Sequence, residues 1–186
     1  LRAWIASNDS LGSSGASGGF NTSTSIVDAA TNGDQRAFTK TLLDATILST
    51  HTGGGKLKAL MCSPYVKTVF DTFMSDSNVV PMRRAATASD SNTIVGTAEF
   101  YQSAFGLLAV VPNVQMARAG AAVARNAFLI DPDKLAMGTF RDINVVTPAV
   151  TGDAIKKVAV CEYSLLVDNE ACQGVVADLY GLSATT

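Results

Sequence analysis

The stretch from Thr151 to Leu179 reads TGDAIKKVAVCEYSLLVDNEACQGVVADL and is the most informative part of the chain. A Gly-Asp turn leads into a long extended run, Ile155 to Asp168. Apolar residues occupy both alternating sets of positions in this run, as expected of a strand that is buried on both faces. The stretch contains no nucleophile–base pair, metal-binding cluster or phosphate loop, so it indicates a structural role.

The composition of the chain limits the classes of protein to which it can belong. The 186 residues suffice for one or two domains, and the net charge of -2 argues against a nucleic-acid binder or a polybasic membrane binder. No apolar run reaches the roughly 18 residues of a membrane helix. Charged residues make up 16% of the chain, against about 25% in an average soluble domain. We expect a surface that partner molecules cover; the alternative is a monomer with a surface of small residues.

The first part of the chain predicts two helices and a short strand. Residues 7–25 are rich in Gly and Ser, which predicts a loop or linker that is mobile unless neighbours pin it. A helix is expected from about Asp34 to Thr50, with Phe38, Leu42 and Ala45 on one face and Leu43 and Ile47 beside them. A strand is expected from Lys56 to Met61. Ser63 and Pro64 then suit the N-cap and first position of a second helix.

The remainder of the chain predicts mainly strands. Asn113–Ala124 is interpreted as a loop or short helix, and Cys172–Leu182 as a final strand or short helix. Because the helices come early and the strands late, the predicted fold class is α+β. The expected strands are Thr93–Gln102, Leu107–Val111, Asn126–Ile130, Lys134–Phe140, Asn144–Val150 and Ile155–Asp168.

A glycine-rich segment, residues 53–55 followed by Lys56, superficially resembles a phosphate-binding loop. The motif G-x-x-x-x-G-K-[ST] requires Gly where Thr50 stands and Ser or Thr where Leu57 stands. The segment also follows a predicted helix instead of a strand. A helix C-cap and turn explain the glycines better.

Other possible catalytic or metal-binding residues are equally isolated. Ser63 and His51 could form a triad with an aspartate, but Ser63 lacks the G-x-S-x-G elbow. The acidic segments at 131–133 and 151–153 lack the further ligands of a calcium loop and predict turns or caps. We therefore predict no enzyme activity, catalytic residue, metal or cofactor.

The three cysteines, Cys62, Cys161 and Cys172, form neither a CxxC pair nor a zinc pattern. They are predicted to be buried free thiols in a reducing cytoplasm.

Four arginines in the middle of the chain are candidate interface residues: Arg83, Arg84, Arg118 and Arg125. Solvated surface or internal pairing is the simpler interpretation. In an assembly their guanidinium groups could bridge carboxylates of neighbouring subunits, because the planar fork suits that role.

Several short motifs follow one another in a recognisable order. They are the Ser-Pro helix ending at Phe73, Glu99-Phe100-Tyr101-Gln102-Ser103-Ala104-Phe105-Gly106, Val110-Val111-Pro112, Leu129-Ile130-Asp131-Pro132, Thr151-Gly152-Asp153 and Glu162-Tyr163-Ser164-Leu165. This order resembles the C-terminal two-thirds of a tailed-bacteriophage major capsid protein with the Johnson (Hong Kong 97-type) fold. Ala104 departs from the pattern, since an acidic residue often stands there.

The resemblance implies an axial and a peripheral domain. Residues 34–133 and 169–186 would form the axial domain, and residues 134–168 the peripheral strands. Residues 1–33 would be a peripheral remnant and Gly/Ser-rich loop. The family's N-terminal arm, extended loop and spine helix are expected before Leu1 and are missing from this sequence; the strand Ile155–Asp168 would run beside that helix.

The implied function is self-assembly into pentamers and hexamers of an icosahedral shell around double-stranded DNA. Partners would be other copies of the chain, with scaffold, portal and decoration proteins, and DNA only non-specifically; no membrane is implied. The protein would be made in the host bacterial cytoplasm and reside in the virion. The alternatives are an encapsulin-like compartment shell protein and a small ligand-binding or enzyme module.

Overall fold

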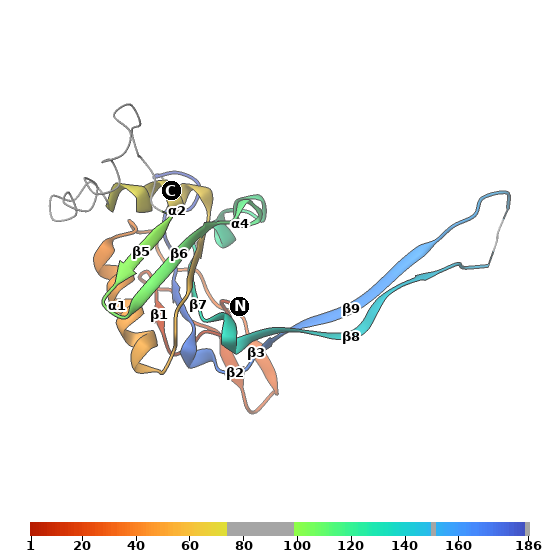
Figure 1. The fold of residues 1–186 in the computed structure, drawn as a ribbon, viewed down its shortest axis with the longest axis horizontal. Helices are drawn as coiled ribbons and strands as arrows, with labels where there is room; N and C mark the ends of the chain where they lie inside the picture. Colours follow the sequence, from red (N-terminus) through yellow and green to blue (C-terminus); the bar gives the residue numbers. More distant parts are fainter. Residues whose placement is uncertain (74–98, 150–151, 185–186) are drawn as a thin grey trace. The chain divides into compact units, whose positions relative to one another are not determined.

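The structure of the chain, a computed structural model, describes residues 1–73, 99–149 and 152–184 (Figure 1). These residues divide into two units. The first, which we call the sheet unit, comprises Leu1–Pro132 with Asn169–Thr186, and the second, the ribbon, comprises Asp133–Asp168. The α+β class predicted from the order of elements is confirmed.

A six-stranded mixed sheet forms the centre of the sheet unit. Its strands in spatial order are β1 (Asp9–Ser10), β10 (Gly174–Val176), β7 (Ala127–Ile130), β4 (Ala59–Cys62), β6 (Gly106–Pro112) and β5 (Phe100–Ser103). The β1–β10 and β4–β6 pairs are parallel and the other pairs are antiparallel. A separate hairpin joins β2 (Gly19–Asn21) to β3 (Ile26–Asp28).

The two longer helices begin at side-chain caps. Helix α1 (Lys40–Thr52) follows Thr39, whose hydroxyl accepts from the Leu42 amide, and α2 (Pro64–Thr72) follows Ser63, whose hydroxyl accepts from the Val66 amide. The predicted Ser-Pro helix start is therefore confirmed. The shorter helices are α4 (Val114–Arg118), α5 (Ala121–Ala124) and the 3-10 turns η2 (Pro132–Lys134) and η3 (Glu170–Cys172).

Alternating residues of the strands build two apolar cores, one on each face of the sheet. Leu129 and Val176 belong to the larger core, which also contains Leu43 and Ile47 of α1 and Phe70 of α2. Their neighbours Phe128 and Val175 belong to the smaller core, together with Ile5, Met116 and Ala177. The alternation follows from the two-residue period of a strand.

Helix α1 starts later than predicted, at Lys40 instead of about Asp34. The reason lies in Arg36, whose amide donates to the Asp178 carbonyl and whose carbonyl accepts from the Tyr180 amide. These bonds hold residues before Thr39 in an extended path. The buried face agrees in part with the predicted one. Phe38, Leu43 and Ile47 are buried as expected, whereas Ala45 is exposed and Thr46 is buried instead.

The Gly/Ser-rich segment, predicted to be a loop or linker that is mobile unless neighbours pin it, packs closely against other parts of the sheet unit. A Cβ at Gly12 would lie 2.1 Å from the Asp34 carbonyl oxygen, and one at Gly33 would lie 2.7 Å from the Gly12 carbonyl oxygen. Such distances leave no room for a side chain. Glycine is used at these two positions for close approach of backbones.

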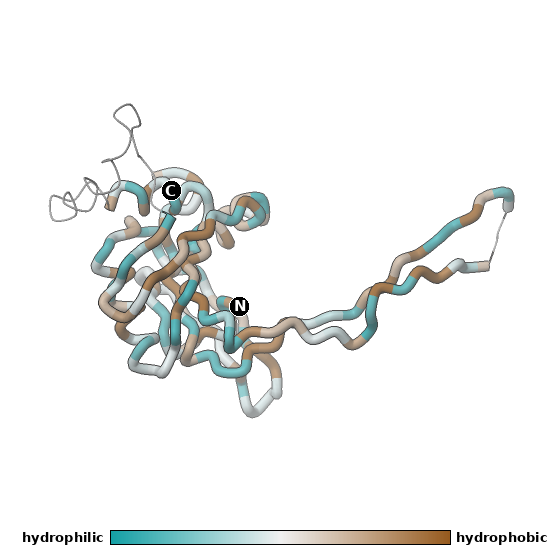
Figure 2. Tube along the Cα trace, viewed as in Figure 1, coloured by the Kyte–Doolittle hydropathy of each residue, from teal (hydrophilic) through white to brown (hydrophobic). Residues whose placement is uncertain are grey.

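The ribbon is a two-stranded antiparallel hairpin of β8 (Leu135–Val146) and β9 (Val158–Val167). Two strands were predicted where β8 is continuous, and the pairing of β8 with β9 shifts in register between Thr139 and Asn144. Figure 2 shows hydrophobic segments, in brown, recurring along both strands of the ribbon.

Candidate intersubunit surface

The ribbon carries apolar side chains on both of its faces. Directly paired residues of an antiparallel ribbon share a face, and successive pairs alternate. Ala136 pairs with Leu166, and the next pair, Met137 with Leu165, lies on the opposite face. A two-stranded ribbon has no second layer, so it covers neither face by itself.

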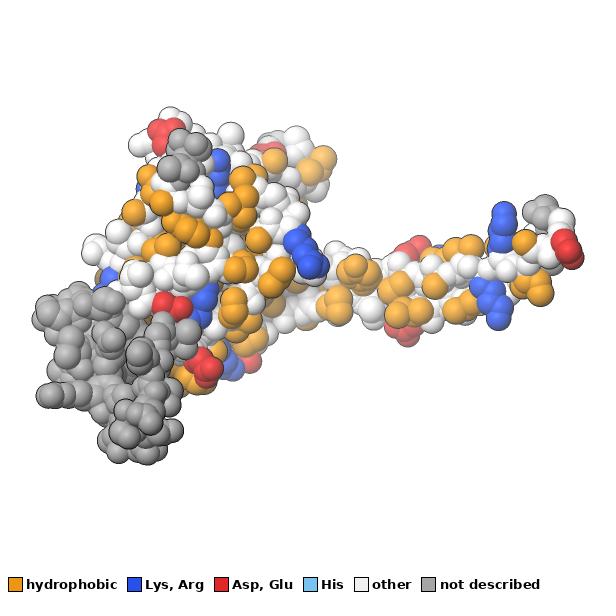
Figure 3. Space-filling view, turned by 90° about the horizontal axis from the view of Figure 1, so that it is seen from above, with side chains coloured by type: hydrophobic (Ala, Val, Ile, Leu, Met, Phe, Trp, Pro, Cys, Tyr) orange, Lys and Arg blue, Asp and Glu red, His pale blue; other side chains and the backbone are white. Residues whose placement is uncertain are grey.

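Exposure along the ribbon confirms that these side chains are uncovered within the described chain. The most exposed is Phe140 at 88%, and Leu166, near the end of β9, is 55% exposed. Figure 3 shows the hydrophobic side chains in orange along this unit. The large apolar residues exposed on the ribbon are Met137, Phe140, Ile143, Val145, Val146, Ile155, Val158, Tyr163, Leu165 and Leu166.

The expected burial of the strand Ile155–Asp168 beside a spine helix stays a prediction, because the described residues contain no such helix. Most of β9 is exposed on both faces, and Cys161, predicted to be a buried thiol, is exposed with it. The alternating apolar pattern was recognised, but a pattern of this kind does not say whether the covering layer belongs to the same chain. Cys62 and Cys172 are buried free thiols, as predicted.

The charges of the ribbon form two cross-strand ion pairs. Lys134 Nζ lies 2.9 Å from Asp168 Oδ2, and Arg141 Nε lies 3.6 Å from Glu162 Oε2. Both pairs are exposed, so each contributes little to stability. The ribbon also carries exposed Asp142, Asp153, Lys156 and Lys157, so it presents charged as well as apolar side chains to a partner.

The four predicted interface arginines are not brought together in the described part of the chain. Arg83 and Arg84 lie outside the described residues. Arg118 is exposed in the last turn of α4, and Arg125 is half-buried directly after α5. The buried Nε of Arg125 has no hydrogen-bond partner among the described residues. The role of all four in subunit contacts stays a prediction.

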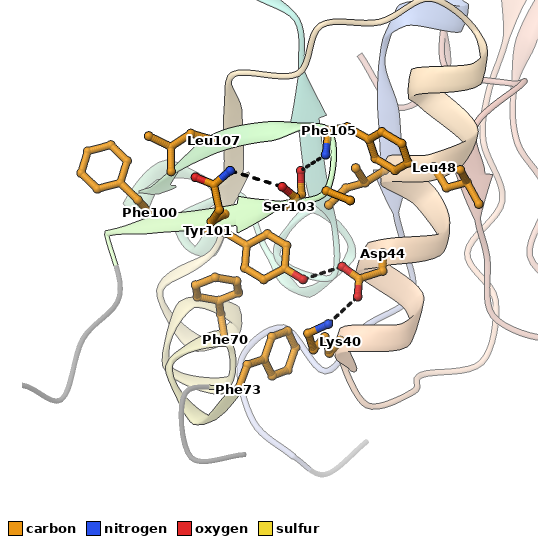
Figure 4. A pocket seen from close by; sticks show the side chains of 13 residues that line it. Lys40, Asp44, Leu48, Phe70, Phe73, Phe100, Tyr101, Ser103, Phe105 and Leu107 are labelled. Atoms are coloured by element: carbon orange, nitrogen blue, oxygen red, sulfur yellow. Dashed lines mark hydrogen bonds and ion pairs between the residues drawn. The ribbon is translucent and has the colours of Figure 1, made fainter. Parts of the chain in front are cut away.

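A cavity of about 770 Å³ opens in the sheet unit, and aromatic and aliphatic side chains such as Phe70, Phe100 and Leu107 line it (Figure 4). Its polar groups satisfy one another. Asp44 accepts hydrogen bonds from the Tyr101 hydroxyl at 2.5 Å and from Lys40 Nζ at 2.6 Å. Burial, with the Asp44 hydrogen bond adding to it, raises the pKa of Tyr101 to about 12.

This cavity offers poor conditions for acid–base or nucleophilic chemistry. The hydrogen bond to Asp44 raises the pKa of Lys40, so the amine stays protonated at neutral pH. A phenol with a pKa of about 12 also keeps its proton. A general base or nucleophile works best with a pKa near the working pH.

The other candidate catalytic groups have different partners. The buried Ser63 hydroxyl donates to the Gly181 carbonyl at 3.1 Å and caps α2. The His51 ring stacks on Phe105 at 4.5 Å. Among the residues that the structure describes, no group of His, Cys, Asp and Glu could hold a metal ion.

The glycines at 53–55 end α1, as predicted. Gly53 is the C-cap residue of α1, and the Lys56 amide donates to Asp131 Oδ2 at 2.9 Å.

Within the described residues, no helix is long and apolar enough to cross a membrane.

The sequence profile of the SU10 major capsid protein family matches residues 1–180. The chain belongs to this family. No curated protein matches the chain at a significant level. The resemblance to phage major capsid proteins is confirmed at the family level.

As an SU10-family major capsid protein, the chain is a structural component of the virion, and its family indicates self-assembly into a shell. This membership favours a non-enzymatic role. Membership of this family also accounts for the exposed apolar residues of the ribbon, since a shell subunit buries part of its surface only after assembly. Sequence reasoning missed Met137, Phe140 and Ile143 as candidate contact residues. The recurrence of a large apolar residue every three positions was the available signal.

Proposed function

We propose that the chain assembles into pentamers and hexamers of an icosahedral shell that encloses double-stranded DNA, and that the ribbon is a principal contact between subunits. The observation that carries this proposal is the apolar character of both ribbon faces. An isolated two-stranded hairpin is at best marginally stable in water. A covering layer from other copies removes the exposed apolar area and orders the ribbon.

We further propose that the domains follow the Hong Kong 97-type arrangement, with residues 34–133 and 169–186 axial and residues 134–168 peripheral. Residues 1–33 belong to the sheet unit in this chain, because β1 pairs with β10. Supporting partners in assembly would be scaffold, portal and decoration proteins. The protein would be made in the cytoplasm of the host bacterium.

Packaged DNA is proposed to contact the shell only non-specifically. The chain has a net charge of -2, with 14 basic and 16 acidic residues. DNA affinity grows with the number of phosphates that Lys and Arg neutralise. A near-neutral wall therefore holds the genome weakly.

The contact role of the ribbon is tested by the double variant Phe140→Ser, Ile143→Ser in the full-length protein. Their side chains are 88% and 76% exposed, so the fold of the subunit should be unchanged. We expect at least tenfold fewer closed shells by negative-stain electron microscopy, with the same circular dichroism spectrum as the wild type. The matched control is Phe140→Leu, which keeps an apolar side chain and should assemble normally.

Wild-type shell yields from the double variant would rule out the ribbon as a principal contact. If the wild-type protein formed no shell alone or with its scaffold, while remaining a monodisperse monomer, the shell function itself would be wrong. The Phe140→Leu control separates a loss of apolar contact from a general intolerance of substitution at this position.

A further inference from the structure

Residues 1–36, which we call the strap, lie along one edge of the sheet unit and supply its edge strand β1 (Figure 1). Strand β1 of the strap pairs with β10, near the other end of the chain, with Asp9 opposite Val175. The Ala177 amide donates to the Ser10 carbonyl at 2.8 Å, and the Tyr180 amide donates to the Arg36 carbonyl at 3.1 Å. Both ends of the strap are thus tied to the same short C-terminal segment.

Asp178 is the central attachment point of the strap. Its residue is fully buried, and its carboxylate accepts from the Gly12 amide at 3.0 Å and from Arg2 Nη2 at 3.3 Å. Arg2 also donates to Asn32 Oδ1 at 2.6 Å, which connects the start of the strap with its second half. One buried carboxylate therefore gathers three separate parts of the strap.

The backbone of Asp178 is also unusual, because its φ is +58°. Few residues other than glycine adopt this left-handed conformation, and Asp and Asn are among those that tolerate it. Its carbonyl accepts from the Arg36 amide at 2.8 Å. The position is therefore held by contacts with the strap from both its side chain and its main chain.

The remaining attachments of the strap are mostly polar. Glu170 accepts from the Ala6 and Ser7 amides at 3.0 and 3.2 Å and from the Ser7 hydroxyl. Asn8 donates to the carbonyls of Ala171 and Gln173. Ile5 is the one large apolar side chain of the strap that is fully buried.

The rest of the sheet unit is held differently. Its larger core consists of apolar residues from α1, α2, β4, β6, β7 and β10, together with Phe38 and Leu179. No residue of the strap belongs to this core. A segment that is rich in Gly and Ser and is held mainly by hydrogen bonds regains much conformational freedom when it is released. Segments with few buried apolar contacts open separately from the core in native proteins.

We propose that the strap is a releasable element latched by Asp178, which detaches from the sheet unit as one segment while the larger core stays folded. Release uncovers the outer edge of β10, whose N–H and C=O groups can then pair with another strand. It also uncovers the smaller apolar core that Ile5 fills. The strap is thus a conformational device that controls access to this edge.

The test is hydrogen exchange, read by mass spectrometry, on the full-length protein carrying Asp178→Asn. Asn keeps the shape and tolerates the left-handed backbone, so the variant removes mainly the charge. We expect at least tenfold faster exchange throughout the strap, including the amides of Ala16, Thr31 and Asp34, with β4, β6 and β7 unchanged. The matched control is Asp131→Asn, a buried aspartate whose carboxylate accepts from the Lys56 amide, outside the strap.

Equal acceleration in the strap and in β4 and β7 would overturn the proposal, because the strap would then belong to one cooperative unit. Unchanged strap exchange in Asp178→Asn would overturn the latch role, as would the same strap response in Asp131→Asn. A second variant, Ile5→Ala, keeps the proposal testable if Asp178→Asn does not fold. It should accelerate the distant amides of Thr31 and Asp34 together with those near Ile5, and acceleration near Ile5 alone would contradict release as one segment.

Discussion

Buried polar residues of the sheet unit form hydrogen bonds between segments that are distant in sequence. The Asp131 amide donates to Gln173 Oε1 and the Asp131 carbonyl accepts from Gln173 Nε2, both at 2.9 Å. This reciprocal pair joins the end of β7 to the start of β10. The Asp131 carboxylate also accepts from the Lys56 amide. The acidic segment continues into the 3-10 turn η2, so the predicted turn is confirmed.

The exposed thiol of Cys161 provides a residue-scale prediction. In the unassembled subunit, Cys161 should react with a thiol reagent such as iodoacetamide at pH 8 at least tenfold faster than Cys62. Burial raises the pKa of Cys62 to about 12, so its reactive thiolate form is scarce at that pH. Peptide mass spectrometry after timed labelling gives the rates.

Shell assembly should then protect Cys161, since the ribbon carries it. Cys161→Ser identifies the fast-reacting peptide, and labelling in urea shows that all three thiols can react. Rapid labelling of Cys161 in intact shells would place β9 outside the subunit contacts.

At the scale of single elements, α2 illustrates a helix start that local chemistry and tertiary packing both stabilise. Ser63→Ala should lower the free energy of unfolding by about 1–3 kcal/mol, because it removes the cap and leaves the buried Gly181 carbonyl without its donor. Urea denaturation of the purified subunit measures the change.

The comparison for this prediction is Thr39→Ala at the start of α1. The cap bond of Thr39 has the same length as that of Ser63, 3.4 Å, but Thr39 is exposed, so a loss of only about 0.5–1 kcal/mol is expected. A Ser63→Ala effect no larger than that of Thr39→Ala would contradict a double role for Ser63.

The ribbon is the element whose stability depends most on other molecules. Its strands pair from Leu135–Val167 to Val146–Val158, yet they have no covering layer within the described residues. Hairpins gain stability mainly when a third strand or a helix packs on them. Assembly and ordering of the ribbon should therefore occur together.

At the scale of the whole molecule, the two units should be separable. Both cores of the sheet unit consist only of its own residues. The Asp168 amide donates to the Lys134 carbonyl at 3.1 Å, so a short turn can join these residues. A variant that replaces residues 135–167 with Gly-Gly should keep the thermal midpoint of the sheet unit and form no shells.

Differential scanning calorimetry and electron microscopy check the two parts of this prediction. A control that keeps the ribbon but replaces only the exposed residues at 153–156 with Gly and Ser should retain the same midpoint. Unfolding of the deletion variant would show that the sheet unit needs the ribbon, and shells from the variant would show that assembly does not.

The sequence by itself determined much of the local structure and the family. Ser63 and Pro64 predicted the start of α2, and the apolar runs predicted β4, β6 and β7 to within a few residues. The order of short motifs indicated a phage major capsid protein, which the family match confirms. These features depend on residues close together in the chain, so the sequence alone was sufficient.

Tertiary structure alone decided three features that depend on distant residues. The Gly-rich segment is packed, because Asp178 and Asp34 lie against its glycines. Helix α1 begins at Lys40, because Arg36 pairs with residues near the end of the chain. The ribbon is exposed within the described residues. An apolar pattern on both faces of a strand predicts a covering layer, but it does not say whether that layer comes from the same chain or from another molecule.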